Sequence, residues 1–161
     1  GCPLRLEHVG STSVPGLCAK PVLDVLLGVP SLAQATASIA VLGSLGYRYR
    51  PEHEARIPQR RYFVRDAGAL PRVHLHAVLA NGPLWHEHLA FRDALRQDGA
   101  LAARYAGLKR ELAATHALDK AGYTAAKAPF ISVTAQCARC GVRARTIAAR
   151  FRGVTSSQIA A

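Results

Sequence analysis

The hydrophobic and polar positions change their period along the chain, from two residues in the first half to three or four in the second. Short alternating or continuous apolar runs predict strands over residues 5–10, 22–29, 47–50, 60–65 and 72–79. One helix is predicted between the second and third of these strands, over residues 33–45, with Ser31 as its N-cap and Gly46 just past its end. The last two strands are joined by a short turn, so we expect them to pair antiparallel.

Helical spacing dominates the second half of the chain. Three further helices are predicted over residues 84–97, 100–117 and 119–135. The second of them has an apolar stripe at the spacing of a buried helix face, formed by Leu101, Tyr105, Leu108 and Leu112. A chain with strands first and helices afterwards favours an α+β fold, in which one mixed or antiparallel sheet is packed by helices.

The positive charge is unevenly distributed. The 161 residues include 21 Lys and Arg against 10 Asp and Glu, a net charge of +11. Residues 136–161 contribute five Arg and no acid, and apolar periodicity fades there, so we expect a domain over residues 1–135 followed by a basic, weakly ordered tail. The domain then carries +6. This favours a small anionic partner over nucleic acid, because only 6% of the residues are aromatic and base stacking needs exposed aromatic rings.

The expected cellular location and the expected redox state of the cysteines both depend on motifs that the sequence does not contain. No apolar run approaches the roughly 18 residues that a membrane span needs, and no signal peptide is visible, so a cytoplasmic protein without membrane association is expected. Cys137 and Cys140 have the spacing of half a zinc site or of a redox pair. A zinc ribbon needs a second pair at ligand spacing, which Cys2 and Cys18 do not supply, so reduced thiols are expected.

The segment Gly10–Gly16 (GSTSVPG) has the composition of an anion-binding turn. Small residues let backbone N–H groups approach an anion, the hydroxyls of Ser11 and Thr12 add donors, and Lys20 adds a positive charge. The segment is not a Walker A loop, because it lacks the Gly-Lys-Ser/Thr ending. An ordinary turn is the alternative interpretation, since most Gly- and Ser-rich loops bind nothing.

Three further residues have the chemistry of a metal site. Asp24 interrupts an apolar strand, where a carboxylate is costly to bury unless it is paired, hydrogen-bonded or metal-bound. His74 and His76 are two residues apart on a strand and therefore point to the same face. Two neutral imidazoles and one carboxylate would suit a divalent metal. The alternative is an ion-paired acid beside one core histidine and one solvated histidine. Glu7 and His8 alternate, so one of them is expected to face this site.

Cations of the helical half are candidates for phosphate binding. Arg92 and Arg96 are one turn apart and could hold an anion, with Asp93 orienting one of them. A solvated charged face is the alternative. Lys109 is a further cation on the next predicted helix.

These segments, taken in order, resemble the GrpB family. The resemblance covers about residues 4–131 and is carried by Glu7–Leu17 (EHVGSTSVPGL), Ala19–Val25 (AKPVLDV), Arg61–Phe63, His74–His76, Phe91–Arg96 and Tyr105–Lys109. Compared with that family, the chain is expected to lack an N-terminal helical segment and to carry an unrelated C-terminal tail.

The resemblance implies a nucleotidyltransferase-like core, in which a Gly-Ser turn binds nucleotide phosphates and strand carboxylates hold Mg²⁺ or Mn²⁺ for attack on a phosphoryl group. Gly10 and Ser11 match the Gly-Ser pair, and Asp24 matches the first carboxylate. Leu26 stands where the second carboxylate is expected. His74 and His76 are therefore candidates to complete a one-metal site, in which Asp24 and His76 are the expected catalytic residues.

Two functions are compatible with this sequence. The leading hypothesis is a nucleotide- or phosphometabolite-binding, nucleotidyltransferase-like protein that performs metal-dependent phosphoryl or nucleotidyl transfer. In it, Lys20, Arg92 and Lys109 offset phosphate charge, and Gly10, Ser11 and Thr12 position the phosphate. The alternative is a non-catalytic adaptor that binds a nucleotide or CoA-type anion and has lost the second metal carboxylate. Some members of the family are joined to a dephospho-CoA kinase domain, which agrees with a phosphate-containing ligand in either case.

Overall fold

The computed structural model describes residues 4–66, 68 and 71–151, which form two compact units divided after His88. The strands of the first unit are β1 (Arg5–Val9), β2 (Val22–Val29), β3 (Arg48–Tyr49), β4 (Arg60–Arg65) and β5 (Arg72–Leu79). Its short helices are η1 (Ser11–Ser13), α1 (Leu32–Ala37), α2 (Ile39–Ser44) and η2 (Pro51–His53). Helix α3 (Pro83–Gln97) begins in the first unit, and the second unit adds α4 (Gly99–Thr115), α5 (Lys120–Arg139) and α6 (Ala144–Arg150).

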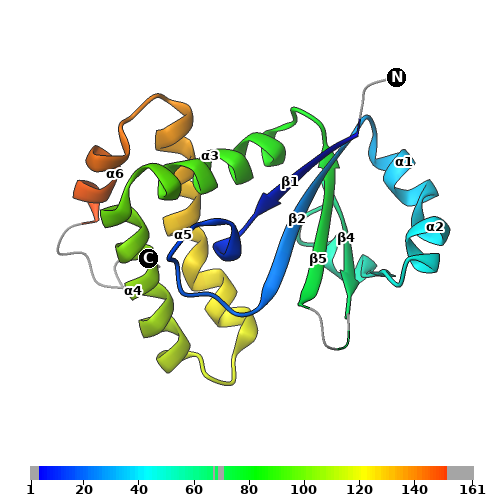
Figure 1. The fold of residues 1–161 in the computed structure, drawn as a ribbon, viewed down its shortest axis with the longest axis horizontal. Coiled ribbons are helices and arrows are strands. Elements are labelled where there is room, and N and C mark those ends of the chain that lie inside the picture. Colours follow the sequence, from blue (N-terminus) through cyan, green and yellow to red (C-terminus); the bar gives the residue numbers. More distant parts are fainter. Residues whose placement is uncertain (1–3, 67, 69–70, 152–161) are drawn as a thin grey trace. The chain divides into compact units, whose positions relative to one another are not determined.

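The first unit is built on a five-stranded mixed sheet with the strand order β1-β2-β5-β4-β3 (Figure 1). Strands β2 and β5 are parallel, and every other neighbouring pair is antiparallel. The expected antiparallel pairing of residues 60–65 with 72–79 is confirmed. The α+β class with a mixed sheet, predicted from the order of the apolar patterns, is confirmed as well.

Helices α1 and α2 cover one face of this sheet (Figure 1). The buried core on that face consists of Val29, Ala35, Phe63, Leu75 and Ala77. These strand residues occupy alternate positions, so the residues between them point to the opposite face. One face of the sheet therefore packs under α1 and α2, and the opposite face places its polar side chains beside the buried residues Leu26, Val64 and Val78.

The single helix predicted over residues 33–45 is two short helices that meet at Ser38. The predicted N-cap is confirmed, because the Ser31 hydroxyl oxygen accepts a hydrogen bond from the Gln34 N–H at 3.2 Å. The Ser38 hydroxyl donates to the Gln34 carbonyl at 2.9 Å, a local bond that competes with regular helix geometry. Gly46 follows the second helix with φ +83°, the left-handed conformation expected just past a helix end.

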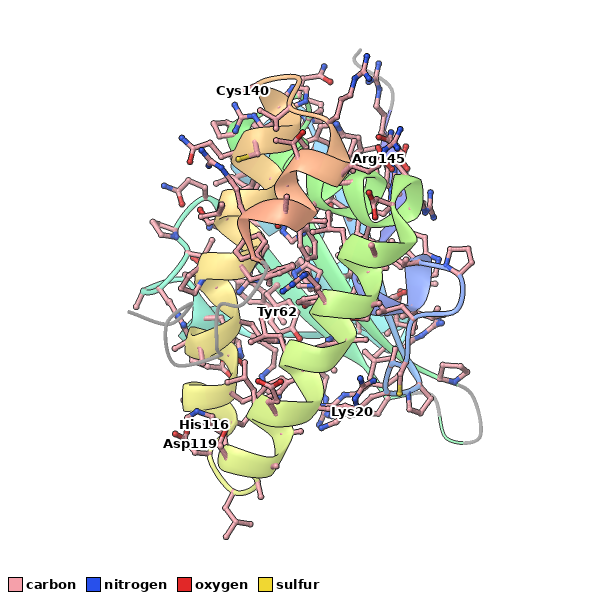
Figure 2. All side chains as sticks on the ribbon, turned by 90° about the vertical axis from the view of Figure 1, so that its left-hand side faces the viewer. Lys20, Tyr62, His116, Asp119, Cys140 and Arg145 are labelled. Carbon is pink, nitrogen blue, oxygen red and sulfur yellow. The ribbon has the colours of Figure 1, made fainter. Side chains whose placement is uncertain are left out.

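In the second unit the predicted stripe of helix α4 is confirmed, because Leu101, Tyr105, Leu108 and Leu112 are all buried. The ring of Phe130 in α5 stacks on that of Tyr105 at 5.4 Å. Helices α4 and α5 are joined by a short turn at which His116 and Asp119 face each other (Figure 2), with Nδ1 and Oδ2 3.6 Å apart. No helix among the described residues has the length and apolar character needed to cross a membrane.

The expectation of a weakly ordered tail is wrong for residues 136–151. Helix α5 continues to Arg139, and α6 follows after a turn at Gly141. Ile147 is fully buried, and the Phe151 ring stacks on Phe130 at 4.4 Å. Sparse apolar positions one helical turn apart therefore pack this segment, although it contains four arginines and no acid. Residues 152–161 lie outside the described residues.

The thiols of the CxxC pair lie at the end of α5. Cys137 is buried and Cys140 is exposed, and neither forms a disulfide. Arg150 of α6 donates a hydrogen bond to the Cys137 sulfur at 3.5 Å. Cys137 thereby belongs to the packing between α5 and α6. Cys2 lies outside the described residues.

Candidate functional site

The polar face of the sheet brings Asp24 of β2 beside two histidines of β5. In the parallel pair, Asp24 lies opposite His74, and Leu26 lies opposite His76. Partners in register and residues two apart share a face, so all four side chains point away from α1 and α2. The prediction that His74 and His76 share a face is therefore confirmed.

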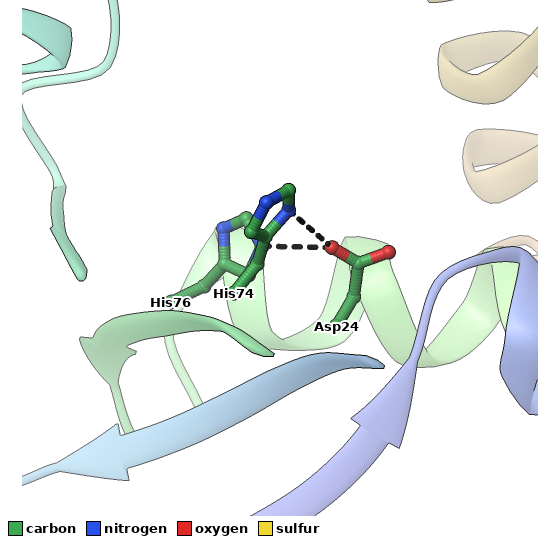
Figure 3. Close-up of side chains that lie close together, drawn as sticks. All are labelled: Asp24, His74 and His76. Atoms are coloured by element: carbon green, nitrogen blue, oxygen red, sulfur yellow. Dashed lines mark hydrogen bonds and ion pairs between the residues drawn. The ribbon is translucent and has the colours of Figure 1, made fainter. Parts of the chain in front are cut away.

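The three polar side chains converge (Figure 3). Asp24 Oδ1 lies 3.2 Å from His74 Nδ1 and 3.5 Å from His76 Nε2. One ligand atom from each residue lies within 4.8 Å of the other two, which is close enough for one cation to contact all three. The residues predicted as metal ligands are brought together, and metal binding itself stays a prediction.

The environment of the cluster favours the protonation states that a metal site requires. Burial raises the pKa of the Asp24 carboxyl, but hydrogen bonds and charge from His74 and His76 outweigh burial and hold that pKa well below its usual range. Burial lowers the pKa of His76, against the opposing hydrogen bond from Asp24. An ionised carboxylate and a neutral imidazole are the forms that bind metal.

The predicted anion-binding turn packs directly against Asp24. Gly10 has φ +73°, and a Cβ there would lie 2.3 Å from Asp24 Oδ2, so only glycine fits. The Ser13 hydroxyl donates to the Gly10 carbonyl at 2.6 Å, which fixes the turn. Gly10 therefore stands beside the cluster, and the role of Gly10 and Ser11 as the Gly-Ser pair, which the family resemblance implies, stays a prediction. Their binding of phosphate is untested.

Thr12 connects the same turn to strands β1 and β2 through hydrogen bonds. The Thr12 hydroxyl donates to the Val22 carbonyl at 2.9 Å and lies 3.0 Å from His8 Nε2. Glu7 shares the face of Asp24, because it pairs with Leu26, and His8 points to the other face. One of the two thus faces the site, as expected. Glu7 does not belong to the cluster of described residues that could hold a metal ion.

The predicted phosphate-binding cations are divided between the two units. Lys20 is exposed in the loop before β2. Arg92 lies in the second unit, where its Nε donates to Asp93 Oδ1 at 2.7 Å. Lys109, also in the second unit, lies over the Tyr105 ring at 5.1 Å. Phosphate binding by these three residues stays a prediction.

Three residues around the cluster were not identified from the sequence as part of the site. Tyr62 of β4 lies opposite His76, with the two rings 5.0 Å apart. Arg60 Nη1 lies 3.2 Å from His76 Nδ1. The ring of His88 in α3 lies 5.8 Å from that of His76. Strand alternation places Arg60 and Tyr62 on one face, but their register with His76 depends on the turn between β4 and β5, which the sequence does not specify.

The same surroundings shift the pKa values of Tyr62 and His88. Burial raises the pKa of the Tyr62 phenol, and the Asp24 charge raises it further. Burial lowers the pKa of His88 to about 4, with smaller contributions from His76 and Arg60. The cluster is therefore surrounded by neutral aromatic groups and one permanent cation.

Comparison with known proteins supports one family. A family model described as "GrpB protein" matches residues 2–136. An UPF0157 protein of Deinococcus radiodurans is 38% identical over 134 residues, which cover 80% of this chain and 64% of the relative. The crystal structure of the conserved protein GrpB from Enterococcus faecalis has a TM-score of 0.72 at 32% identity and covers 85% of this chain and 81% of that one.

A further relative has a name that refers to an activity. A protein of Mycolicibacterium paratuberculosis named "Dephospho-CoA kinase" is 32% identical over 150 residues, which cover 79% of this chain and 37% of the relative. The chain spans 32% of a Bacillus subtilis relative and 64% of the one from Deinococcus radiodurans, so it matches only part of their length.

Proposed function

The chain belongs to the GrpB family, and from that premise we propose that it binds a divalent metal ion together with a nucleotide or another phosphometabolite. The observation that carries the proposal is the convergence of Asp24, His74 and His76 beside the Gly10 turn. A cation and a phosphate group attract each other, so a metal site beside an anion-binding turn suits a ligand that contacts both.

The donor set favours one of the two expected metals. Two imidazole nitrogens and one carboxylate oxygen suit Mn²⁺ better than Mg²⁺, because Mg²⁺ prefers oxygen ligands throughout. Three protein ligands also leave coordination positions for oxygens of a bound phosphate. When bound, the metal would act as a Lewis acid on a phosphoryl oxygen. We propose Mn²⁺ as the physiological type of ion, held by Asp24, His74 and His76.

The phosphate would lie on the turn that begins at Gly10. The backbone N–H groups there and the Lys20 amine supply positive charge, and Ser11 supplies a hydroxyl. The kinase name of the Mycolicibacterium relative favours a phosphate-containing ligand. The reaction class proposed is metal-dependent phosphoryl or nucleotidyl transfer. Asp24 and His76 would act in it as ligands of the metal ion that contacts the reacting phosphoryl group.

Leu26 favours a second candidate function, in which the protein binds its ligands without catalysis. It is completely buried on the face of Asp24, at the position where the family resemblance implies a second carboxylate. A two-metal mechanism needs that carboxylate. An adaptor that binds the metal and the anion without turnover is the second candidate function, and the buried leucine is the observation that favours it.

Calorimetric titration with Mn²⁺, with and without a non-hydrolysable ATP analogue, tests the proposal. Asp24→Asn keeps the side-chain shape and removes the charged ligand, so we expect Mn²⁺ affinity to fall at least about tenfold. Asp66→Asn is the matched control, because Asp66 pairs with Arg48 and Arg72 at an exposed position of the same unit. Equal Mn²⁺ affinity of the wild type and Asp24→Asn would refute the site. Turnover of ATP itself, measured with Mn²⁺ on the same protein preparations without the analogue, separates the enzyme from the adaptor.

A further inference from the structure

Arg60 is a cation on the polar face of the sheet that forms no ion pair with any described acid of the first unit. Its contacts are the hydrogen bond to His76 and the face of the Tyr62 ring, over which the guanidinium carbon lies at 4.9 Å. Its Nε is buried and has no hydrogen-bond partner among the described residues. A partly buried cation without a counter-charge is energetically unfavourable, and a bound anion would remove that cost.

The acids of the neighbourhood are engaged elsewhere. Asp24 faces the two histidines, and Glu52 pairs with Arg50 at 2.5 Å. Glu54 pairs with Arg61 at 3.1 Å. Burial lowers the pKa of Arg60, Tyr62 opposes this, and the nearby charge of Arg56 lowers that pKa further. No acid that the structure describes forms an ion pair with Arg60, and an anionic ligand would supply the missing charge.

The contact between Arg60 and His76 also determines where the imidazole carries its proton. A guanidinium only donates hydrogen bonds, so Nδ1 of His76 must accept, and the proton of the neutral ring then sits on Nε2. Nε2 lies 3.5 Å from Asp24 Oδ1, the geometry of a weak donor to a carboxylate.

A metal ion in the cluster requires the other tautomer. A metal bound to Nε2 occupies the lone pair of that nitrogen and leaves the proton on Nδ1, where it would meet the donor of Arg60. The hydrogen bond from Arg60 and metal binding by Nε2 therefore exclude each other. A metal could reach His76 only after the guanidinium has moved to another partner.

We propose that Arg60 binds the phosphate group of the ligand and, by leaving His76 to do so, makes Nε2 of His76 available to the metal ion. This inference rests on the proposed function and adds a coupling to it. The anion draws the guanidinium away, the proton moves from Nε2 to Nδ1, and the metal gains its third protein ligand. Anion and metal then bind with positive cooperativity, each raising the affinity for the other by the same factor.

Mn²⁺ titration with and without sulfate tests the coupling. Sulfate is a tetrahedral dianion that mimics phosphate and binds Mn²⁺ weakly in solution, and chloride keeps the ionic strength equal. We expect sulfate to tighten Mn²⁺ binding at least about fivefold in the wild type. In Arg60→Met the sulfate effect should disappear, and Mn²⁺ should bind more tightly than in the sulfate-free wild type, because the competing donor is gone.

Arg65→Met is the matched control. Arg65 lies on the same strand, and its buried Nε also has no hydrogen-bond partner within the part of the chain that the structure describes. It stands on the opposite face, over the ring of Tyr47. The Arg65→Met substitution removes the same charge from β4 and should leave the sulfate effect intact. A sulfate effect that survives in Arg60→Met, or that is lost equally in Arg65→Met, would overturn the proposal.

The tautomer of His76 gives a second test that needs no variant. Long-range ¹H–¹⁵N spectra of the metal-free wild type should show the proton on Nε2, and Zn²⁺ with sulfate should move it to Nδ1. A proton on Nδ1 in the metal-free protein would refute the coupling. If no metal binds at all, the proposed metal function fails. The role of Arg60 is then tested separately, because sulfate should bind more weakly to Arg60→Met than to the wild type if Arg60 binds the anion.

Discussion

The two faces of the sheet carry different tasks on the same strands. On one face Val25, Leu27, Leu75 and Ala77 pack under α1 and α2 and exclude water. On the other face the residues between them include Asp24, His74 and His76, which lie close enough to share a cation. Substitutions of these apolar residues should therefore affect mainly stability, and substitutions of the three polar residues mainly ligand binding. The packing on the apolar face explains how the strands can hold three ligands in register.

The largest expected effect comes from the neighbouring pair Tyr62 and Phe63. Phe63 is fully buried on the apolar face, and Phe63→Ala should lower the free energy of unfolding by about 3–5 kcal/mol. Tyr62→Phe keeps the ring that contacts His74 and His76 and should cost less than about 1 kcal/mol. Urea denaturation of both variants measures the difference. Equal losses would mean that the two faces do not divide their tasks in this way.

The division between the faces could be read from the sequence only in part. The alternation of RVHLHAVL predicts that His74 and His76 share a face, and the lone acid in VLDVLLGV indicates a special role for Asp24. That Asp24 lies opposite His74 could not be predicted, because the parallel pairing joins residues 50 positions apart. Arg60 and Tyr62 were missed for a related reason, since their approach to His76 depends on the register between β4 and β5.

The segment after residue 135 shows a different limit. Composition favours weak order there, because the segment has five arginines and no acid and its large apolar residues show no clear period. Ile147 and Phe151 are one turn apart, and two such residues are too few for a periodic signal, yet both are buried. Burial of this kind depends on partners such as Phe130 in α5, which local sequence does not identify.

His88 provides a pH-dependent test of the polar face. Burial lowers the pKa of His88 to about 4 in the folded protein, against about 6.5 in the unfolded chain. The unfolded chain therefore binds a proton first as the pH falls, so stability is complete above pH 6.5 and decreases toward pH 4. The loss is at most about 3 kcal/mol, because part of the side chain meets solvent.

His88→Leu should flatten this decline, measured by urea denaturation of the metal-free protein between pH 7 and pH 4. His86→Leu is the matched control, because His86 lies on the exposed side of the same helix and should leave the decline in place. If both variants retain the full decline, His88 is not the group responsible, and the low polarity inferred for its surroundings is wrong.

The prediction that joins structure to ligand binding most directly concerns Gly10. Gly10 and Gly16 have nearly the same backbone conformation, with φ +73° and +74°. A Cβ at Gly16 would meet nothing within 4 Å, whereas one at Gly10 would overlap Asp24. Gly16→Ala therefore reports the backbone strain alone, about 1 kcal/mol.

Gly10→Ala should cost more than Gly16→Ala, by about 1–2 kcal/mol, because the turn or the Asp24 carboxylate must move. It should also weaken Mn²⁺ binding, which Gly16→Ala should not, since only the first displaces a proposed ligand. Urea denaturation and Mn²⁺ calorimetry on the two variants give both quantities. Equal stability losses would show that the turn does not press on Asp24. Unchanged Mn²⁺ affinity with a larger loss for Gly10→Ala would show that the turn supports the sheet without positioning the carboxylate.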